Sequence, residues 1–159
     1  MKKIGTYTVR GQISENEVEA GTHGHRIILF DGRFDTGYRV TDFRIWGSDF
    51  GGSSNPDVIG KLGTEPDLPE QAADFMNAGD NREIAWAASA GATDAGLGFA
   101  EAPVIDPDNM IIEDLYVYVR SPSDASDVNY MITLEKYDIT DWQGALSMVK
   151  NRSQGDSNN

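Results

Sequence analysis

Residues 40–46, VTDFRIW, and residues 112–118, IEDLYVY, follow one pattern and decide the fold. Each runs aliphatic, polar, Asp, apolar, any residue, β-branched, aromatic, which predicts two strands. In each, one extra residue, at Thr41–Asp42 and at Glu113–Asp114, returns the apolar side chains to one face, as a β-bulge does. We interpret the two as counterpart strands in the two layers of a curved double sheet. A chance similarity between short strand-like segments is the alternative.

The chain is acidic and contains no cysteine. Its 159 residues fit one domain, with 26 Asp and Glu against 13 Lys and Arg and a formal net charge of −13. Such a surface repels phosphate backbones, so we expect no nucleic-acid partner. No apolar run approaches the roughly 18–20 residues of a membrane span, and we expect no membrane partner. The opening MKKIGTYTV lacks the apolar region of a signal peptide.

Alternation with a period of two dominates the first 139 residues. Tyr7, Val9 and Ile13 share one face of the first segment. Asp31-Gly32 predicts a hairpin turn, because both residues tolerate positive φ. Roughly seven to nine short strands separated by loops rich in Gly, Ser and Asp predict a mainly β fold. We expect residues 1–139 to form an antiparallel β-sandwich of the jelly-roll type.

One C-terminal amphipathic helix is predicted at residues 140–153, before a polar tail at 154–159. Thr140 and Gln143 have the spacing of a capping box. Trp142, Leu146 and Val149 recur at i, i+4 and i+7, which places them on one face. This apolar stripe indicates packing either on the sandwich of the same chain or on a neighbouring subunit.

The sequence indicates no catalytic, cofactor-binding or metal-binding residues. His23 and His25 have the spacing of a metal-binding pair on a strand, but the chain has no third histidine and Gly24 favours a turn. No nucleophile elbow, dinucleotide-binding glycine motif or phosphate-binding loop occurs. A structural calcium ion is the alternative to plain polar turns at two clusters, which are Asp106, Asp108 and Asn109, and Ser121, Ser123, Asp124 and Asp127.

Aromatic residues are the best candidates for recognition. If Leu115, Val117 and Val119 face the core, then Tyr116 and Tyr118 face outward. Outward aromatics are typical of protein interfaces and of carbohydrate platforms, although a second layer of the same chain explains them equally well. The candidate interface residues are Trp46, Tyr116, Tyr118, Trp142, Leu146 and Val149.

Four segments of the chain resemble small jelly-roll-type virion structural proteins of tailed bacteriophages, especially marine ones. They are GYRVTDFRIW, NREIAWAAS, DNMIIEDLYVYV and VNYMITLEKYDITDWQGALSMVKNRSQ. The resemblance implies a non-enzymatic subunit that is made in the host cytoplasm and resides in the virion. It also implies a symmetric homo-oligomer in contact with other virion proteins. The component, whether capsid decoration or cement, vertex, head or tail protein, stays open.

The main alternative function is a carbohydrate-binding β-sandwich module with exposed aromatics and a structural calcium ion. The two functions differ in whether Trp46, Tyr116 or Tyr118 lie coplanar on an open face or are buried between chains. A third hypothesis is a cupin-type metalloenzyme that uses His23 and His25.

Overall fold

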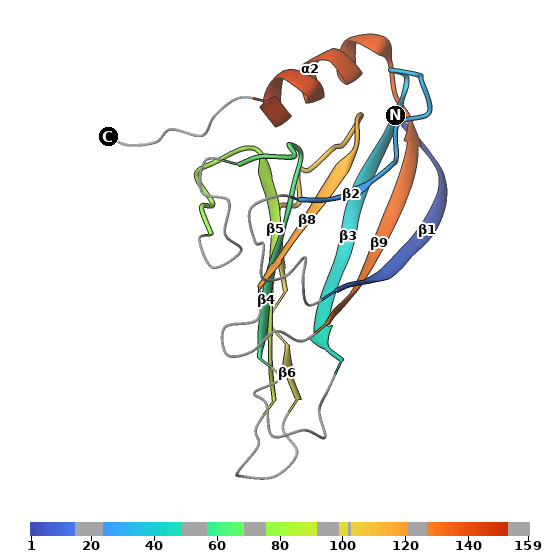
Figure 1. The fold of residues 1–159 in the computed structure, drawn as a ribbon. Helices are drawn as coiled ribbons and strands as arrows, with labels where there is room; N and C mark the ends of the chain where they lie inside the picture. Colours follow the sequence, from blue (N-terminus) through green and yellow to red (C-terminus); the bar gives the residue numbers. More distant parts are fainter. Residues whose placement is uncertain are drawn as a thin grey trace.

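The computed structural model describes residues 1–14, 24–48, 57–68, 76–91, 99–101, 103–120 and 127–152. Within these residues the elements are nine strands and a C-terminal helix (Figure 1). The strands are β1 (Lys2–Ile13), β2 (His25–Ile27), β3 (Thr36–Gly47), β4 (Val58–Gly63), β5 (Glu83–Gly91), β6 (Phe99–Glu101), β7 (Val104–Ile105), β8 (Leu115–Arg120) and β9 (Val128–Asp138). The helix is α2 (Asp141–Arg152).

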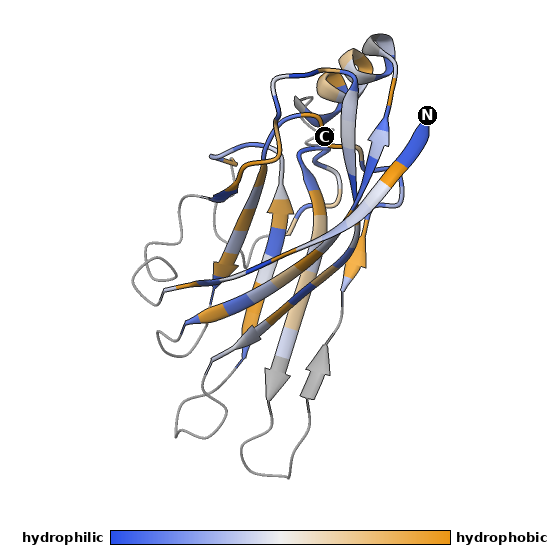
Figure 2. Cartoon of the chain, turned by 90° about the vertical axis from the view of Figure 1, so that its right-hand side faces the viewer, coloured by the Kyte–Doolittle hydropathy of each residue, from blue (hydrophilic) through white to orange (hydrophobic). Residues whose placement is uncertain are grey.

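The strands form two antiparallel sheets packed face to face. The smaller sheet has the order β1-β9-β3, and the larger has the order β2-β8-β4-β5-β6, with β7 also paired to β5. Figure 2 shows the smaller sheet in front of the larger one, with α2 at one end. The predicted antiparallel β-sandwich with one C-terminal helix is therefore confirmed.

The pairing follows the nested winding of a jelly roll. β1 pairs with β9, β2 with β8, and β4 with β5. In sequence order, an isolated bridge between Tyr38 of β3 and Ile111 falls inside the β2–β8 pair and encloses the β4–β5 pair. Each pair is thus enclosed in sequence by the one before it, as in a long hairpin rolled across two sheets.

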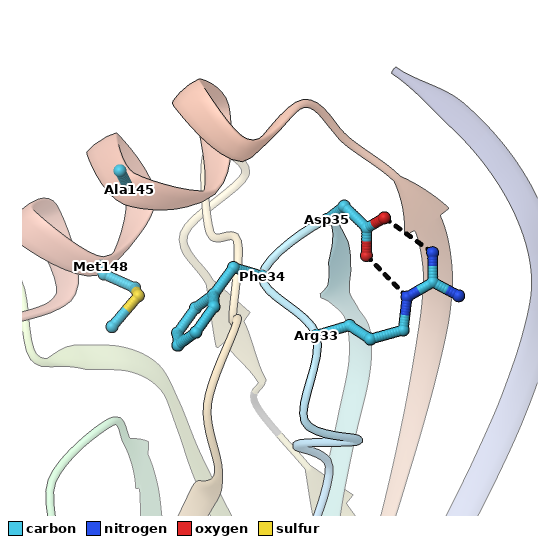
Figure 3. Close-up of a pocket in the computed structure, with 5 residues that line it drawn as sticks. All are labelled: Arg33, Phe34, Asp35, Ala145 and Met148. Atoms are coloured by element: carbon cyan, nitrogen blue, oxygen red, sulfur yellow. Dashed lines mark hydrogen bonds and ion pairs between the residues drawn. The ribbon is translucent and has the colours of Figure 1, made fainter.

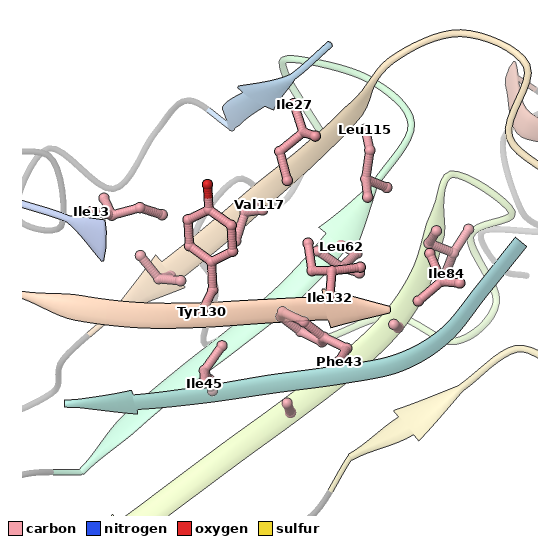
Figure 4. Packing of buried hydrophobic residues seen from close by; sticks show 14 of the residues in the cluster. Ile13, Ile27, Phe43, Ile45, Leu62, Ile84, Leu115, Val117, Tyr130 and Ile132 are labelled. Atoms are coloured by element: carbon pink, nitrogen blue, oxygen red, sulfur yellow. The ribbon is translucent and has the colours of Figure 1, made fainter. Parts of the chain in front are cut away.

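The core lies between the sheets and takes alternate residues from each strand. Phe43 and Ile45 of β3 and Ile132 of β9 meet Leu62 of β4 and Leu115 of β8 across it (Figure 4). All five side chains are fully buried. Burial of apolar surface stabilises the fold by about 25 cal/mol per Å², so this layer is the main source of stability.

Only the first of the two predicted bulges exists. The register of β3 against β9 shifts between Val40 and Asp42, which leaves Thr41 as the extra residue. β8 begins at Leu115 and pairs without a register shift, so the predicted bulge at Glu113–Asp114 is wrong. The two similar strands do lie in different sheets, as predicted, with β3 in the smaller and β8 in the larger.

Asp114 has a long-range role that a bulge residue would not have. Its buried carboxylate accepts hydrogen bonds from the backbone N–H groups of Leu29, at 3.0 Å, and Phe30, at 3.2 Å. Its Oδ2 also lies 2.5 Å from an Arg26 guanidinium nitrogen. These contacts fix residues 28–30 where the chain leaves β2.

The turn predicted at Asp31-Gly32 is present, but it does not close a hairpin. Gly32 has a φ of 86°, and the Asp31 carboxylate accepts a hydrogen bond from the Arg33 N–H at 3.0 Å. β2 before the turn belongs to the larger sheet and β3 after it to the smaller. Residues 28–35 therefore cross between the layers, at the end of the sandwich where α2 lies (Figure 1).

Candidate interaction surface

Helix α2 begins at the predicted capping box. The Gln143 N–H donates to the Thr140 hydroxyl and the Thr140 N–H donates to the Gln143 side-chain oxygen, both at 3.2 Å. These reciprocal bonds satisfy two backbone donors at the helix start. The helix spans Asp141–Arg152 in the described part of the chain, and residues 153–159 lie outside it.

The face of α2 that touches the sandwich is small and polar. Gly144 is buried, and a Cβ added there would lie 2.2 Å from the carbonyl oxygen of Phe34. At the other end of the helix the buried Asn151 donates its amide to the Met110 carbonyl at 2.7 Å. The Thr64 hydroxyl donates to the Asn151 carbonyl at 2.8 Å. These contacts fix which face of the helix points outward.

The outward face carries the apolar stripe. Trp142 is 69% exposed, Leu146 52% and Val149 67%. The helix therefore packs on the sandwich of its own chain through Gly144 and Asn151, while the apolar stripe stays accessible. The structure places these three predicted interface residues together on one accessible surface.

Residues 28–34 add apolar side chains at the same end of the molecule. Ile28, Phe30 and Phe34 are exposed, and the rings of Phe30 and Phe34 lie 5.3 Å apart between centroids. Sequence reasoning did not identify them, because only the crossing between sheets brings this segment beside α2. We call Trp142, Leu146, Val149, Ile28, Phe30 and Phe34 the helix-end surface.

A depression of about 470 Å³ lies between α2 and the crossing segment beside their contact, lined by Arg33, Phe34, Asp35, Ala145 and Met148 (Figure 3). Its rim carries a bidentate ion pair, in which Arg33 donates to Asp35 at 2.8 and 2.6 Å. The hydrogen bonds from Arg33 lower the pKa of the Asp35 carboxyl, so the pair stays charged at neutral pH. An apolar floor with a charged rim suits a protein contact.

The three aromatic residues predicted on strands do not form one surface. Trp46 lies half-buried on the outer face of the smaller sheet, since its neighbour Ile45 faces the core. Tyr116 and Tyr118 lie on the outer face of the larger sheet, because Val117 between them faces the core. A carbohydrate platform that combines Trp46 with Tyr116 and Tyr118 is therefore not formed.

Tyr118 is also covered by its own chain. Leu68 packs on it and leaves the residue 2% exposed, so its predicted place on an accessible surface is wrong. Burial raises the pKa of the Tyr118 phenol, whose hydroxyl donates to the Glu65 carbonyl at 2.5 Å. Lys61 lies over the Tyr118 ring, with its ammonium 5.7 Å from the ring centre.

Beside Tyr118 lies a buried ion pair that the sequence did not reveal. Lys61 is fully buried and its ammonium lies 3.3 Å from the Glu83 carboxylate. The same carboxylate oxygen accepts hydrogen bonds from the Trp86 indole at 3.1 Å and the Asn77 N–H at 3.2 Å. A buried charge pair held by additional donors is structurally important, because either partner alone would be strongly disfavoured.

The described residues give no metal centre. No group of three or more His, Cys, Asp and Glu side chains in them could hold a metal ion. His25 lies on β2 with its ring 5.9 Å from that of Tyr130, while His23 lies outside the described residues. The calcium cluster at residues 121–127 also lies outside them, except for Asp127.

The other calcium candidate is a turn that holds β3. Asp106 accepts the Asp108 N–H at 2.9 Å. Asn109 is buried and accepts the Val40 N–H at 2.7 Å, while its amide donates to the Val40 carbonyl at 3.0 Å. Because Asn109 is engaged with the backbone next to the bulge, these residues act as a structural clamp.

Comparison of the chain with protein-family models, with curated proteins and with solved structures found no match. No helix in the described ranges is long and apolar enough to cross a membrane.

Proposed function

We propose that this protein is a non-enzymatic structural subunit of a virus particle that assembles as a symmetric homo-oligomer through the helix-end surface. The exposure of the apolar stripe on α2 is the observation that carries this proposal. Other virion proteins are further partners, and the virion is the place of function after synthesis in the host cytoplasm. The jelly-roll winding supports the proposal, since this fold is common in viral capsid domains. Because one fold can serve many functions, the exposed surface has the greater weight.

The stripe has a size that suits self-association. Full burial of a large apolar side chain is worth roughly 1.5–3 kcal/mol. Two copies that pack their stripes together would bury Trp142, Leu146 and Val149 twice. The free energy gained by this burial is of the same size as the roughly 4–15 kcal/mol that association costs in lost translational and rotational freedom. We therefore expect the flanking Phe30 and Phe34 to take part in a stable contact.

The net charge of −13 opposes contact between copies and makes association depend on salt. The stripe residues themselves are uncharged. The Debye length falls from about 10 Å at 0.1 M to about 3 Å at 1 M salt, so repulsion between copies weakens as salt is added. The proposal predicts stronger association at high salt.

A pair of charge-introducing variants tests the surface. Leu146→Glu places a carboxylate in the stripe, whereas Val104→Glu places one on β7, at another exposed apolar residue. Light scattering should show that Leu146→Glu shifts the protein to monomer at concentrations where the wild type and Val104→Glu are oligomeric. Equal masses for all three proteins would contradict the proposal.

A further inference from the structure

The outer face of the smaller sheet is a second accessible surface, separate from the helix-end surface. On the edge strand β1 the outward side chains Thr6, Thr8, Arg10 and Gln12 are exposed. Asn129 and Met131 are only half-buried, although β9 is the central strand. α2 lies at the end of the sandwich and leaves this face open (Figure 2).

The strand registers align side chains of β1, β9 and β3 in rows that run across this face, perpendicular to the strands. Gln12, Asn129 and Trp46 form one row, and the Gln12 amide donates to the Asn129 side-chain oxygen at 3.1 Å. Arg10, Met131 and Arg44 form the next row. Adjacent strands lie about 4.8 Å apart, so a row is about 10 Å wide.

The charge of this face is opposite to that of the chain. Among the paired strand residues described on this face, Lys3, Arg10, Arg39 and Arg44 stand against Asp42 and Glu135, a net charge of +2 on a protein of −13. Arg44 is paired with Asp42 at 2.8 Å, and Lys3 with Glu135. Arg10 is exposed and has no ion-pair partner within the described residues. A basic face on an acidic protein favours an anionic ligand.

We propose that the rows around Trp46 and Arg10 form a binding site for a short acidic saccharide. The Trp46 indole offers an apolar face to a sugar ring, and the amides of Gln12 and Asn129 can donate to and accept from hydroxyl groups. The Arg10 guanidinium matches a carboxylate or sulfate in a bidentate geometry. The acidic remainder of the protein repels an extended polyanion, which limits the ligand to a few sugar units.

A saccharide suits this face better than a protein does. The centre of a protein interface is enriched in aromatic and apolar side chains and depleted of charge. Here, only Trp46 and Met131 supply apolar surface in the two rows. Amide and guanidinium groups beside one indole are suited to a ligand covered with hydroxyl groups.

The test is calorimetric titration of the full chain with three probes: tetragalacturonate, a heparin tetrasaccharide and neutral maltotetraose. We expect at least one acidic probe to bind at least tenfold more tightly than maltotetraose. The carboxylate and sulfate probes separate the two sources of charge. We expect Trp46→Ala to weaken this binding at least tenfold and Arg10→Gln at least fivefold, with Arg120→Gln on the larger sheet as the matched control.

Arg10→Gln keeps the test valid if Trp46→Ala fails to fold, because Arg10 is exposed. Binding to none of the acidic probes, equal binding of the neutral probe, or equal affinities of Arg10→Gln and Arg120→Gln would each overturn the proposal. A change in the solution mass of Arg10→Gln without an effect on saccharide binding would identify the face as a contact between copies, and would also overturn it. The proposed assembly through α2 is tested separately by Leu146→Glu.

Discussion

Gly144 of α2 lies against the backbone of Phe34, so close that a Cβ at residue 144 would stand 2.2 Å from the Phe34 carbonyl oxygen. This approach joins the helix to the segment that crosses between the sheets. It also turns the apolar stripe of the helix away from the sandwich. The orientation of the helix-end surface therefore depends on a residue without a side chain.

Gly144→Ala tests this contact. In an ordinary helix interior the change would stabilise by about 1 kcal/mol. Here we expect a loss of roughly 1–3 kcal/mol in the free energy of unfolding, because the backbone of Phe34 must move. Urea unfolding of Gly144→Ala beside the exposed control Ala145→Ser measures it. A more stable Gly144→Ala protein would show that the close approach does not exist.

Asn109→Ala tests the clamp on the bulged strand. The change leaves the N–H and the carbonyl of Val40 without their Asn109 partner, and each unpaired buried group costs about 1–3 kcal/mol. We expect a loss of roughly 2–4 kcal/mol in urea unfolding. Asp108→Ala, at the exposed neighbouring position, should change stability by less than about 0.5 kcal/mol. Similar losses for the two variants would contradict the clamp.

The contribution of the buried Lys61–Glu83 pair to stability can be tested by comparing a single with a double substitution. Lys61→Met leaves a buried carboxylate without its cation and should destabilise by about 3–5 kcal/mol. Adding Glu83→Gln removes that charge and keeps an acceptor for the Trp86 indole and the Asn77 N–H. We expect the double variant to be more stable than Lys61→Met in chemical unfolding. If the second change adds a further loss, the buried pair is not the source of the effect.

Asp114 should make stability depend on acidic pH. Burial disfavours its charged form, but hydrogen bonds from Phe30, Arg26 and Leu29 outweigh this and lower the pKa of the carboxyl. A lowered folded-state pKa adds stability above the unfolded pKa of about 4, which is lost as pH falls through the folded value. Asp114→Asn should therefore be less stable than the wild type by roughly 1.5–3 kcal/mol at pH 7.

Unfolding measured at pH 7 and at pH 2.5 checks this expectation, because the gap should narrow at the lower pH. Asp42→Asn is the matched control, since Asp42 holds the equivalent place in the first of the two similar strands but pairs with the exposed Arg44. A gap for Asp114→Asn that stays constant with pH would contradict the assigned role.

Local pattern was sufficient to predict some elements. The sandwich follows from alternation, the bulge at Thr41 from a slip in that alternation, and the helix start from the spacing of Thr140 and Gln143. These features depend on neighbours a few residues apart. The sequence therefore contains the whole signal for them.

Features set by distant partners could not be predicted in this way. The pattern at Asp114 resembles a bulge, but its carboxylate is held by residues 26–30. Tyr118 faces outward as predicted, but contacts from distant parts of its own chain, including Leu68 and Glu65, bury it. The sequence leaves open whether the helix packs on its own sandwich or on a neighbour, and the direction of its apolar stripe depends on the contact of Gly144 with Phe34.

If the helix-end surface joins copies of this chain, the mass of the wild-type protein in solution shows it most directly. Light scattering should be recorded over a range of protein concentrations at low and at high salt. We predict a defined oligomer that becomes more prevalent as the protein or the salt concentration rises. A monomer at every protein and salt concentration would contradict it.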